Sequence, residues 1–70
     1  MPHIHIQMYS GRDQKIKERI AQKMQIVLAQ EMQSDKKYCS VSIEDVAPEN
    51  WQSQVEDKIE EKNLLIPADF

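Results

Sequence analysis

The sequence predicts a small α/β (α+β) fold, a β-α-β unit followed by a short C-terminal helix, and three patterns support this. Residues 3–8 alternate between polar and apolar side chains, which is typical of a strand with one face in a core. Residues 14–32 carry apolar side chains at helical spacing, and residues 38–46 alternate again. A strand, a long helix and a second strand indicate two parallel strands joined by a right-handed crossover.

The first strand has an apolar face and a polar face that carries His3 and His5. Two histidines on one side of a strand are a known way of presenting two metal ligands, but a zinc site needs three or four. Two copies meeting in an oligomer would supply four. Metal binding therefore stays open beside the simpler interpretation, in which both histidines face water or a partner.

Pro2 follows Met1 directly. A small second residue usually allows the cell to remove the initiator methionine, which would leave Pro2 as an amino terminus with a secondary amine. An α-amino group titrates near about 7.7–8.0, and both desolvation and a neighbouring cation lower that pKa. Pro2 is therefore a candidate general base near neutral pH.

A turn and a long helix come next. Gly11, the single glycine of the chain, gives the turn backbone freedom, and Ser10 or Asp13 can cap the helix that begins near residue 14. One continuous apolar stripe, expected to face the core, runs along this helix: Ile16, Ile20, Met24, Val27, Leu28 and Met32.

The second half of the chain begins with the second strand, where Cys39, Val41 and Ile43 point to one face. Pro48 favours the start of a shorter helix, whose apolar stripe is Trp51, Val55 and Ile59. The apolar tail at residues 64–67 is expected to pack on its own core or on a second subunit.

Length and composition predict a single domain over residues 1–70 that associates with itself. A core of this size supplies only about 3–5 kcal/mol, and the single Cys39 excludes an intrachain disulfide. Two strands alone also leave open edges, so we expect a four-stranded sheet formed across a dimer. A net charge of −3 argues against nucleic acid as a partner. Neither a signal peptide nor a membrane span is evident, and a cytoplasmic location is expected.

Three segments together resemble a known family. Residues 1–6, the Ser10-Gly11-Arg12 turn and the strand Val41-Ser42-Ile43 are similar to the 4-oxalocrotonate tautomerase superfamily. The stretch from residue 41 through Pro48-Glu49-Asn50-Trp51-Gln52 resembles its dimeric, phenylpyruvate-tautomerase-like branch. The resemblance covers about residues 2–66. It implies a keto-enol tautomerase that works without cofactor or metal on a small 2-keto acid or its enol, such as phenylpyruvate.

The resemblance also implies roles for particular residues. Pro2 matches the catalytic base, Arg12 matches an arginine that binds or polarises the substrate carboxylate, and Trp51 matches an aromatic wall of the active site. Arginine suits this role because its planar fork pairs with a carboxylate. By its spacing, Trp51 is equally a core residue of the short helix.

Ser42 stands where the best-known members have a second arginine, which disfavours dicarboxylate substrates. The dimeric branch tends to lack that arginine, so the absence does not argue against an enzyme. The short second helix replaces a hairpin found in hexameric members, so a homodimer is favoured over a hexamer. A non-catalytic oligomeric module that retains Met1 is the alternative, because an acylated proline nitrogen has no lone pair to act as a base.

Overall fold

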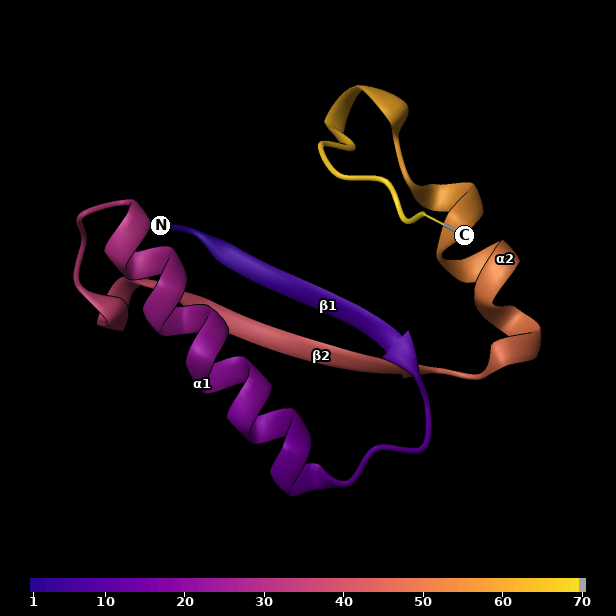
Figure 1. Cartoon of the computed structure of the whole chain (residues 1–70), viewed down its shortest axis with the longest axis horizontal. Coiled ribbons are helices and arrows are strands. Elements are labelled where there is room, and N and C mark those ends of the chain that lie inside the picture. The colour runs from indigo at the N-terminus through magenta and orange to yellow at the C-terminus, as the bar shows by residue number, and fades with distance from the viewer. Residues whose placement is uncertain (70) are drawn as a thin grey trace.

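The computed structural model describes residues 1–69, which form a two-stranded sheet with a long helix across one face (Figure 1). The elements are β1 (His3–Tyr9), α1 (Gln14–Glu31), β2 (Ser40–Val46) and α2 (Trp51–Gln54). The two strands are parallel, with a register that runs from His3 opposite Ser40 to Tyr9 opposite Val46. The predicted β-α-β unit is therefore confirmed. A 3-10 turn over Lys36–Tyr38 precedes β2, which starts two residues later than expected.

The turn between β1 and α1 has a clear local cause. Gly11 has a φ of 120°, in the region where a side chain is strained, so glycine is required there. Asp13 is the N-cap of α1, and its Oδ1 accepts a hydrogen bond from the Ile16 amide at 2.9 Å. Of the two capping candidates, Asp13 is the correct one. Gln33 follows α1 with a φ of 53°, a left-handed conformation that ends the helix.

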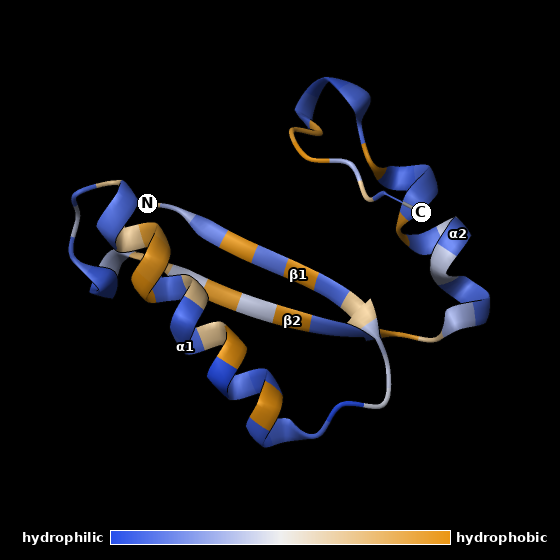
Figure 2. Ribbon diagram, viewed as in Figure 1, coloured by the Kyte–Doolittle hydropathy of each residue, from blue (hydrophilic) through white to orange (hydrophobic). Residues whose placement is uncertain are grey.

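Hydrophilic and hydrophobic residues alternate along β1 (Figure 2), Val41 and Ile43 of β2 lie beside α1, and two polar side chains of α1 fix the helix there. Lys17 Nζ donates to Asp45 Oδ2 at 2.9 Å near one end of α1. Near the other end, Gln25 Nε2 donates to the carbonyl oxygens of Lys36 and Cys39, each at 2.9 Å. The helix is thereby held along most of the sheet.

The predicted apolar stripe of α1 is only half buried. Met24, Val27 and Met32 remain 38%, 50% and 52% exposed, because a two-stranded sheet is too narrow to cover the whole stripe. The fully buried core is small: Ala29, Cys39, Val46 and Val55. Within one chain, the expectation that this stripe faces the core therefore holds only in part.

The predicted second helix is also much shorter than expected. After a 3-10 turn at Pro48–Asn50, α2 makes a single turn that ends at Gln54, with Val55 as its C-cap at a φ of −118° and a ψ of −66°. Trp51 Nε1 donates to Glu56 at 3.2 Å, and Gln52 Nε2 donates to Asp57 at 2.8 Å. Side chains five positions apart do not face each other on a continuous α-helix, so these bonds are compatible only with a helix that is interrupted after Gln54.

The C-terminal residues form 3-10 turns over Glu56–Lys58 and Glu61–Asn63, followed by a tail. Ile59, expected on the buried stripe, is 44% exposed. Leu65 and Ile66 are 90% and 87% exposed, so these two do not pack on their own core. In the described part of the chain, we find no helix with the length and apolar character needed to cross a membrane.

Candidate functional site

An open cavity of about 410 Å³ lies where β1 ends and α2 begins. Arg12 and Trp51, both predicted from the sequence, line this cavity together with Gln7, Met8 and Tyr9. The Tyr9 and Trp51 rings meet edge to face, with centroids 4.9 Å apart and planes at 88°. The cavity thus combines a cation with two aromatic walls, which suits a small anion that carries an apolar group.

The two predicted residues are held very differently. Arg12 is exposed and makes one long hydrogen bond, from Nη1 to the Tyr9 carbonyl oxygen at 3.4 Å. Its guanidinium therefore keeps most of its donors for a ligand. Trp51 is fixed on both sides, by the Tyr9 ring and by the bond from its Nε1 to Glu56.

Pro2 lies at the opposite end of β1. The Ser40 amide donates to the Pro2 carbonyl oxygen at 3.2 Å, which ties Pro2 to the start of β2. Seven strand residues at about 3.3 Å each separate this end of the sheet from the Arg12 cavity by about 20 Å. Within one chain, the structure brings Arg12 and Trp51 together but not Pro2. Met1 is fully exposed and is accessible for removal.

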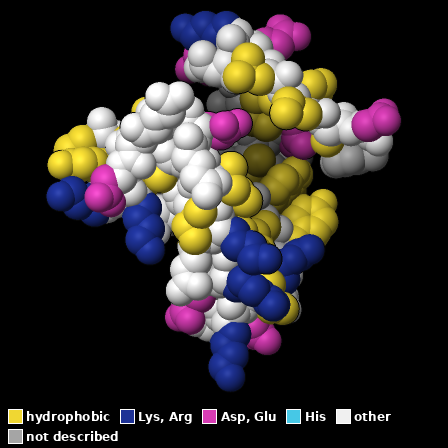
Figure 3. Space-filling view, turned by 60° about the vertical axis from the view of Figure 1, so that its left-hand side comes forward, with side chains coloured by type: hydrophobic (Ala, Val, Ile, Leu, Met, Phe, Trp, Pro, Cys, Tyr) yellow, Lys and Arg dark blue, Asp and Glu magenta, His cyan; other side chains and the backbone are white. Residues whose placement is uncertain are grey.

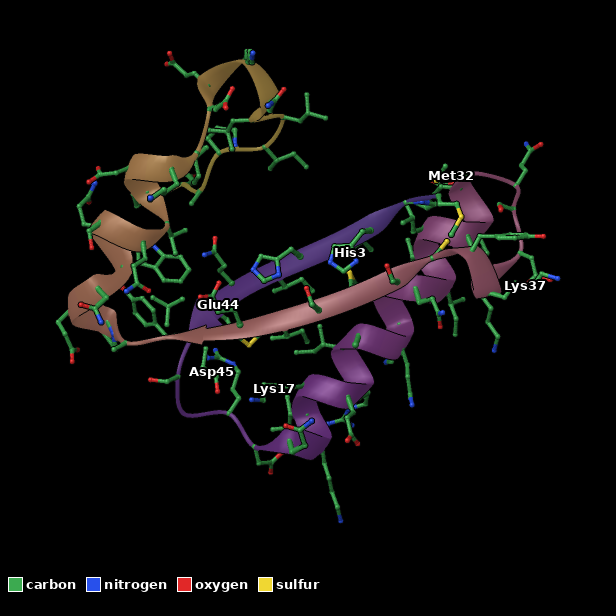
Figure 4. All side chains as sticks on the ribbon, turned by 180° about the vertical axis from the view of Figure 1, so that it is seen from behind. His3, Lys17, Met32, Lys37, Glu44 and Asp45 are labelled. Atoms are coloured by element: carbon green, nitrogen blue, oxygen red, sulfur yellow. The ribbon has the colours of Figure 1, made fainter. Side chains whose placement is uncertain are left out.

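A chain of hydrogen bonds covers the other face of the sheet, opposite α1 (Figure 4). His3 Nδ1 lies 2.6 Å from Ser40 Oγ, and His3 Nε2 lies 3.0 Å from Ser42 Oγ. His5 Nδ1 lies 2.6 Å from the same Ser42 Oγ, and His5 Nε2 lies 3.1 Å from Glu44 Oε1. We call this set, which Gln7 completes, the polar ladder. Each of the two histidines is therefore paired with side chains of the neighbouring parallel strand.

The proton positions in the polar ladder follow from the charge of Glu44, at the end of the ladder. The hydrogen bond from His5, and then the one from Gln7, hold the pKa of the Glu44 carboxyl below its ordinary range. An ionised Glu44 only accepts, so a neutral His5 carries its proton on Nε2 and receives the Ser42 hydroxyl proton at Nδ1. Ser42 then accepts from His3 Nε2, and Ser40 donates to His3 Nδ1. One consistent assignment satisfies every group.

The polar ladder bears on the metal alternative and on Ser42. Both ring nitrogens of each histidine already have a partner, and no group of three or more metal-ligating side chains occurs among residues 1–69. Ser42, in place of a second arginine, is engaged between the two histidine rings.

Three residues of the cavity, Gln7, Met8 and Tyr9, were not predicted as site residues. Tyr9 continues the alternation of β1 on the His3 and His5 face, so extending that pattern by one step would have placed it beside the turn. Its contact with Trp51 joins positions far apart in the chain, and no local pattern signals it.

These features define a small α+β protein with a candidate carboxylate-binding cavity at one end of a parallel strand pair and a proline at the other. The family model described as tautomerase enzyme matches residues 2–59, and the chain belongs to this family. The chain is also 33% identical, over 55 residues, to a probable tautomerase of Xylella fastidiosa (strain 9a5c); the match covers 79% of this chain and 67% of the relative. No solved structure matches the chain significantly. The protein is therefore an enzyme of the isomerase class.

Proposed function

We propose that the protein is a keto-enol tautomerase in which Pro2, freed by removal of Met1, is the general base for a small 2-keto acid or its enol, such as phenylpyruvate. The observation that carries this proposal is the cavity in which Arg12 lies beside the Tyr9–Trp51 pair. In a family of tautomerases, a cation next to aromatic walls supports a substrate with one carboxylate and an apolar substituent.

The distance between Pro2 and the cavity supports a site shared by two copies. If two β1 strands pair antiparallel across their free edges, Pro2 of one copy comes beside the Arg12 end of the other, about 4.8 Å away in strand spacing. Pairing through β2 instead would place three strand spacings between them. The first arrangement gives a four-stranded sheet in the order β2-β1-β1-β2, with two identical sites in a homodimer.

The surface of α1 supports the same arrangement. Both α1 helices would lie on one face of the four-stranded sheet, side by side. The half-exposed residues of the stripe, Met24, Val27 and Met32, would then gain a neighbour. Burial of apolar area is the main favourable term in association, so this stripe favours a dimer over a monomer.

In the proposed reaction, Arg12 of one copy binds the substrate carboxylate, and Trp51 of that copy forms the wall against the apolar substituent. The neutral Pro2 nitrogen of the other copy takes the enol hydroxyl proton and returns it to C3, so that the C2–C3 double bond is replaced by a C2 carbonyl. A guanidinium close to the proline nitrogen favours its neutral, basic form. No cofactor enters these steps.

The environment of Ser42 supports a substrate with a single carboxylate. A dicarboxylate would need a second cation, and this position of β2 instead carries a hydroxyl held between His3 and His5. The free thiol of Cys39 is consistent with a reducing, cytoplasmic location.

The test is the rate of ketonisation of phenylenolpyruvate by protein whose intact mass shows that Met1 is absent. We expect a rate well above that of buffer, and its loss in Pro2→Ala with an unchanged circular dichroism spectrum. A protein that retains Met1 should also be inactive, because its Pro2 nitrogen is an amide. If the Met1-free protein gives no rate above buffer, phenylpyruvate is excluded as a substrate; if Pro2→Ala keeps the full rate, Pro2 is not the base.

A further inference from the structure

The C-terminal arm, which we define as residues 55–69, exposes an apolar surface beside the free edge of β1. It lies on the side of β1 that faces away from β2 (Figure 1). Leu65 and Ile66 are almost fully exposed, and hydrophobic side chains are visible on the outside of the arm (Figure 3). The arm also encloses a groove of about 420 Å³, lined by Trp51, Val55, Glu56, Ile59, Leu64, Ile66, Pro67 and Ala68. An exposed apolar surface of this kind marks an interaction site.

We propose that the arm of one copy docks on the N-terminal end of the sheet of a second copy, and so closes the second copy's proline site. The proposal rests on the antiparallel β1 pairing described above. That pairing brings the start of the second copy's β1 next to the end of the first copy's β1. The arm projects from the same end of the sheet, because α2 follows directly after β2.

Charge complementarity supports this partner. Residues 55–69 carry five acidic side chains (Glu56, Asp57, Glu60, Glu61, Asp69) and two basic ones (Lys58, Lys62), a net charge of −3. At the N-terminal end of the sheet, the turn before β2 presents Lys36 and Lys37, both exposed. In the four-stranded sheet this turn lies at the same end as the second copy's Pro2. Opposite charges there fix which ends of the two copies meet.

Docking would complete the substrate site with apolar walls. Trp51 lines both the Arg12 cavity and the groove of the arm, so the two spaces adjoin. With the second copy's Pro2 beneath the arm, Ile59 and Leu64 would lie beyond the indole, around the apolar part of the substrate. The arm would therefore exclude water from the reacting atoms and favour substrates with a bulky apolar group over small ones such as pyruvate enol.

The test uses paired charge reversals and the dimer dissociation constant, measured by sedimentation. Glu60→Lys/Glu61→Lys and Lys36→Glu/Lys37→Glu should each raise the dissociation constant by about tenfold or more, because like charges then face each other twice in each dimer. An equimolar mixture of the two variants should form mixed dimers close to wild-type affinity, and so should a single chain with all four changes. Lys15→Glu/Arg19→Glu, a matched reversal on exposed residues of α1 that lie away from the Met24 and Val27 side of the helix, should change the constant by less than about threefold.

Several outcomes would overturn the arm proposal: a monomeric wild type, unchanged dissociation constants in both reversed pairs, or no recovery in the mixture. Sedimentation needs no substrate, so it separates this proposal from the proposed activity. A dimer that responds as expected while the Met1-free protein is inactive keeps the arm and refutes the tautomerase reaction. An active dimer that ignores the reversals keeps the reaction and refutes the arm.

Discussion

Replacing Arg12 with glutamine should weaken catalysis without weakening the fold. In the structure, Arg12 makes one hydrogen bond of 3.4 Å to the Tyr9 carbonyl oxygen, and it is otherwise exposed. An exposed substitution of this kind changes the free energy of unfolding by less than about 0.5 kcal/mol. A hydrogen bond to a charged group contributes about 1.5–3 kcal/mol, so kcat/KM should fall about 10- to 150-fold.

The assay is the ketonisation of phenylenolpyruvate over a range of concentrations, with urea unfolding of the same preparations. Lys15→Gln is the matched control, since it removes one positive charge from an exposed position three residues further along. We expect this control to retain kcat/KM within about twofold, because a surface charge outside the cavity acts only through a screened field. Wild-type kcat/KM in Arg12→Gln, or an equal loss in Lys15→Gln, would show that Arg12 does not bind the substrate carboxylate.

Three further predictions concern stability, each measured by urea unfolding. The pKa of Glu44 is lowered in the folded state, so ionised Glu44 stabilises the fold at pH values above its ordinary pKa of about 4.3, and this stabilisation is lost as the pH falls below that value. Glu44→Gln should therefore reduce the loss of unfolding free energy in acid. An equal loss in the variant would exclude the polar ladder as its cause. Asp13→Ala removes the N-cap of α1 and should lower the free energy of unfolding by about 1 kcal/mol, whereas Asp13→Asn should change it little. Equal losses of stability in the two variants would argue against capping by this side chain. Val46 is 1% exposed, and Val46→Ala should cost about 2 kcal/mol from two lost methyl-sized groups plus the cavity; a loss below about 0.5 kcal/mol would contradict its place in the core.

The strands and the long helix could be predicted because each has a local cause. Alternation indicated which face of β1 is apolar, and two capping candidates, Ser10 and Asp13, placed the start of α1 near residue 14. The second helix could not be predicted in the same way. Trp51, Val55 and Ile59 have helical spacing, but the α-helix ends at Gln54, and side-chain bonds from Trp51 to Glu56 and from Gln52 to Asp57 link the residues on either side of that point.

The site shows the same division between local and distant causes. Arg12 and Trp51 are predicted from the family resemblance. Their shared cavity, however, depends on the contact between Tyr9 and Trp51. That contact results from the turn at Gly11 and from the path of the chain after β2. The polar ladder depends on the register of two parallel strands, and periodicity alone does not fix a register.

Mixing two defective variants decides whether the site is built from Pro2 of one copy and Arg12 of another. Pro2→Ala and Arg12→Gln are each purified without Met1, combined in equal amounts, unfolded and refolded together, and assayed with phenylenolpyruvate. Half of the dimers would be mixed, and each mixed dimer would hold one intact site, so activity should recover to about a quarter of the wild-type value per chain. Activity no higher than the average of the two variants, in a sample shown to contain mixed dimers, would contradict a shared site.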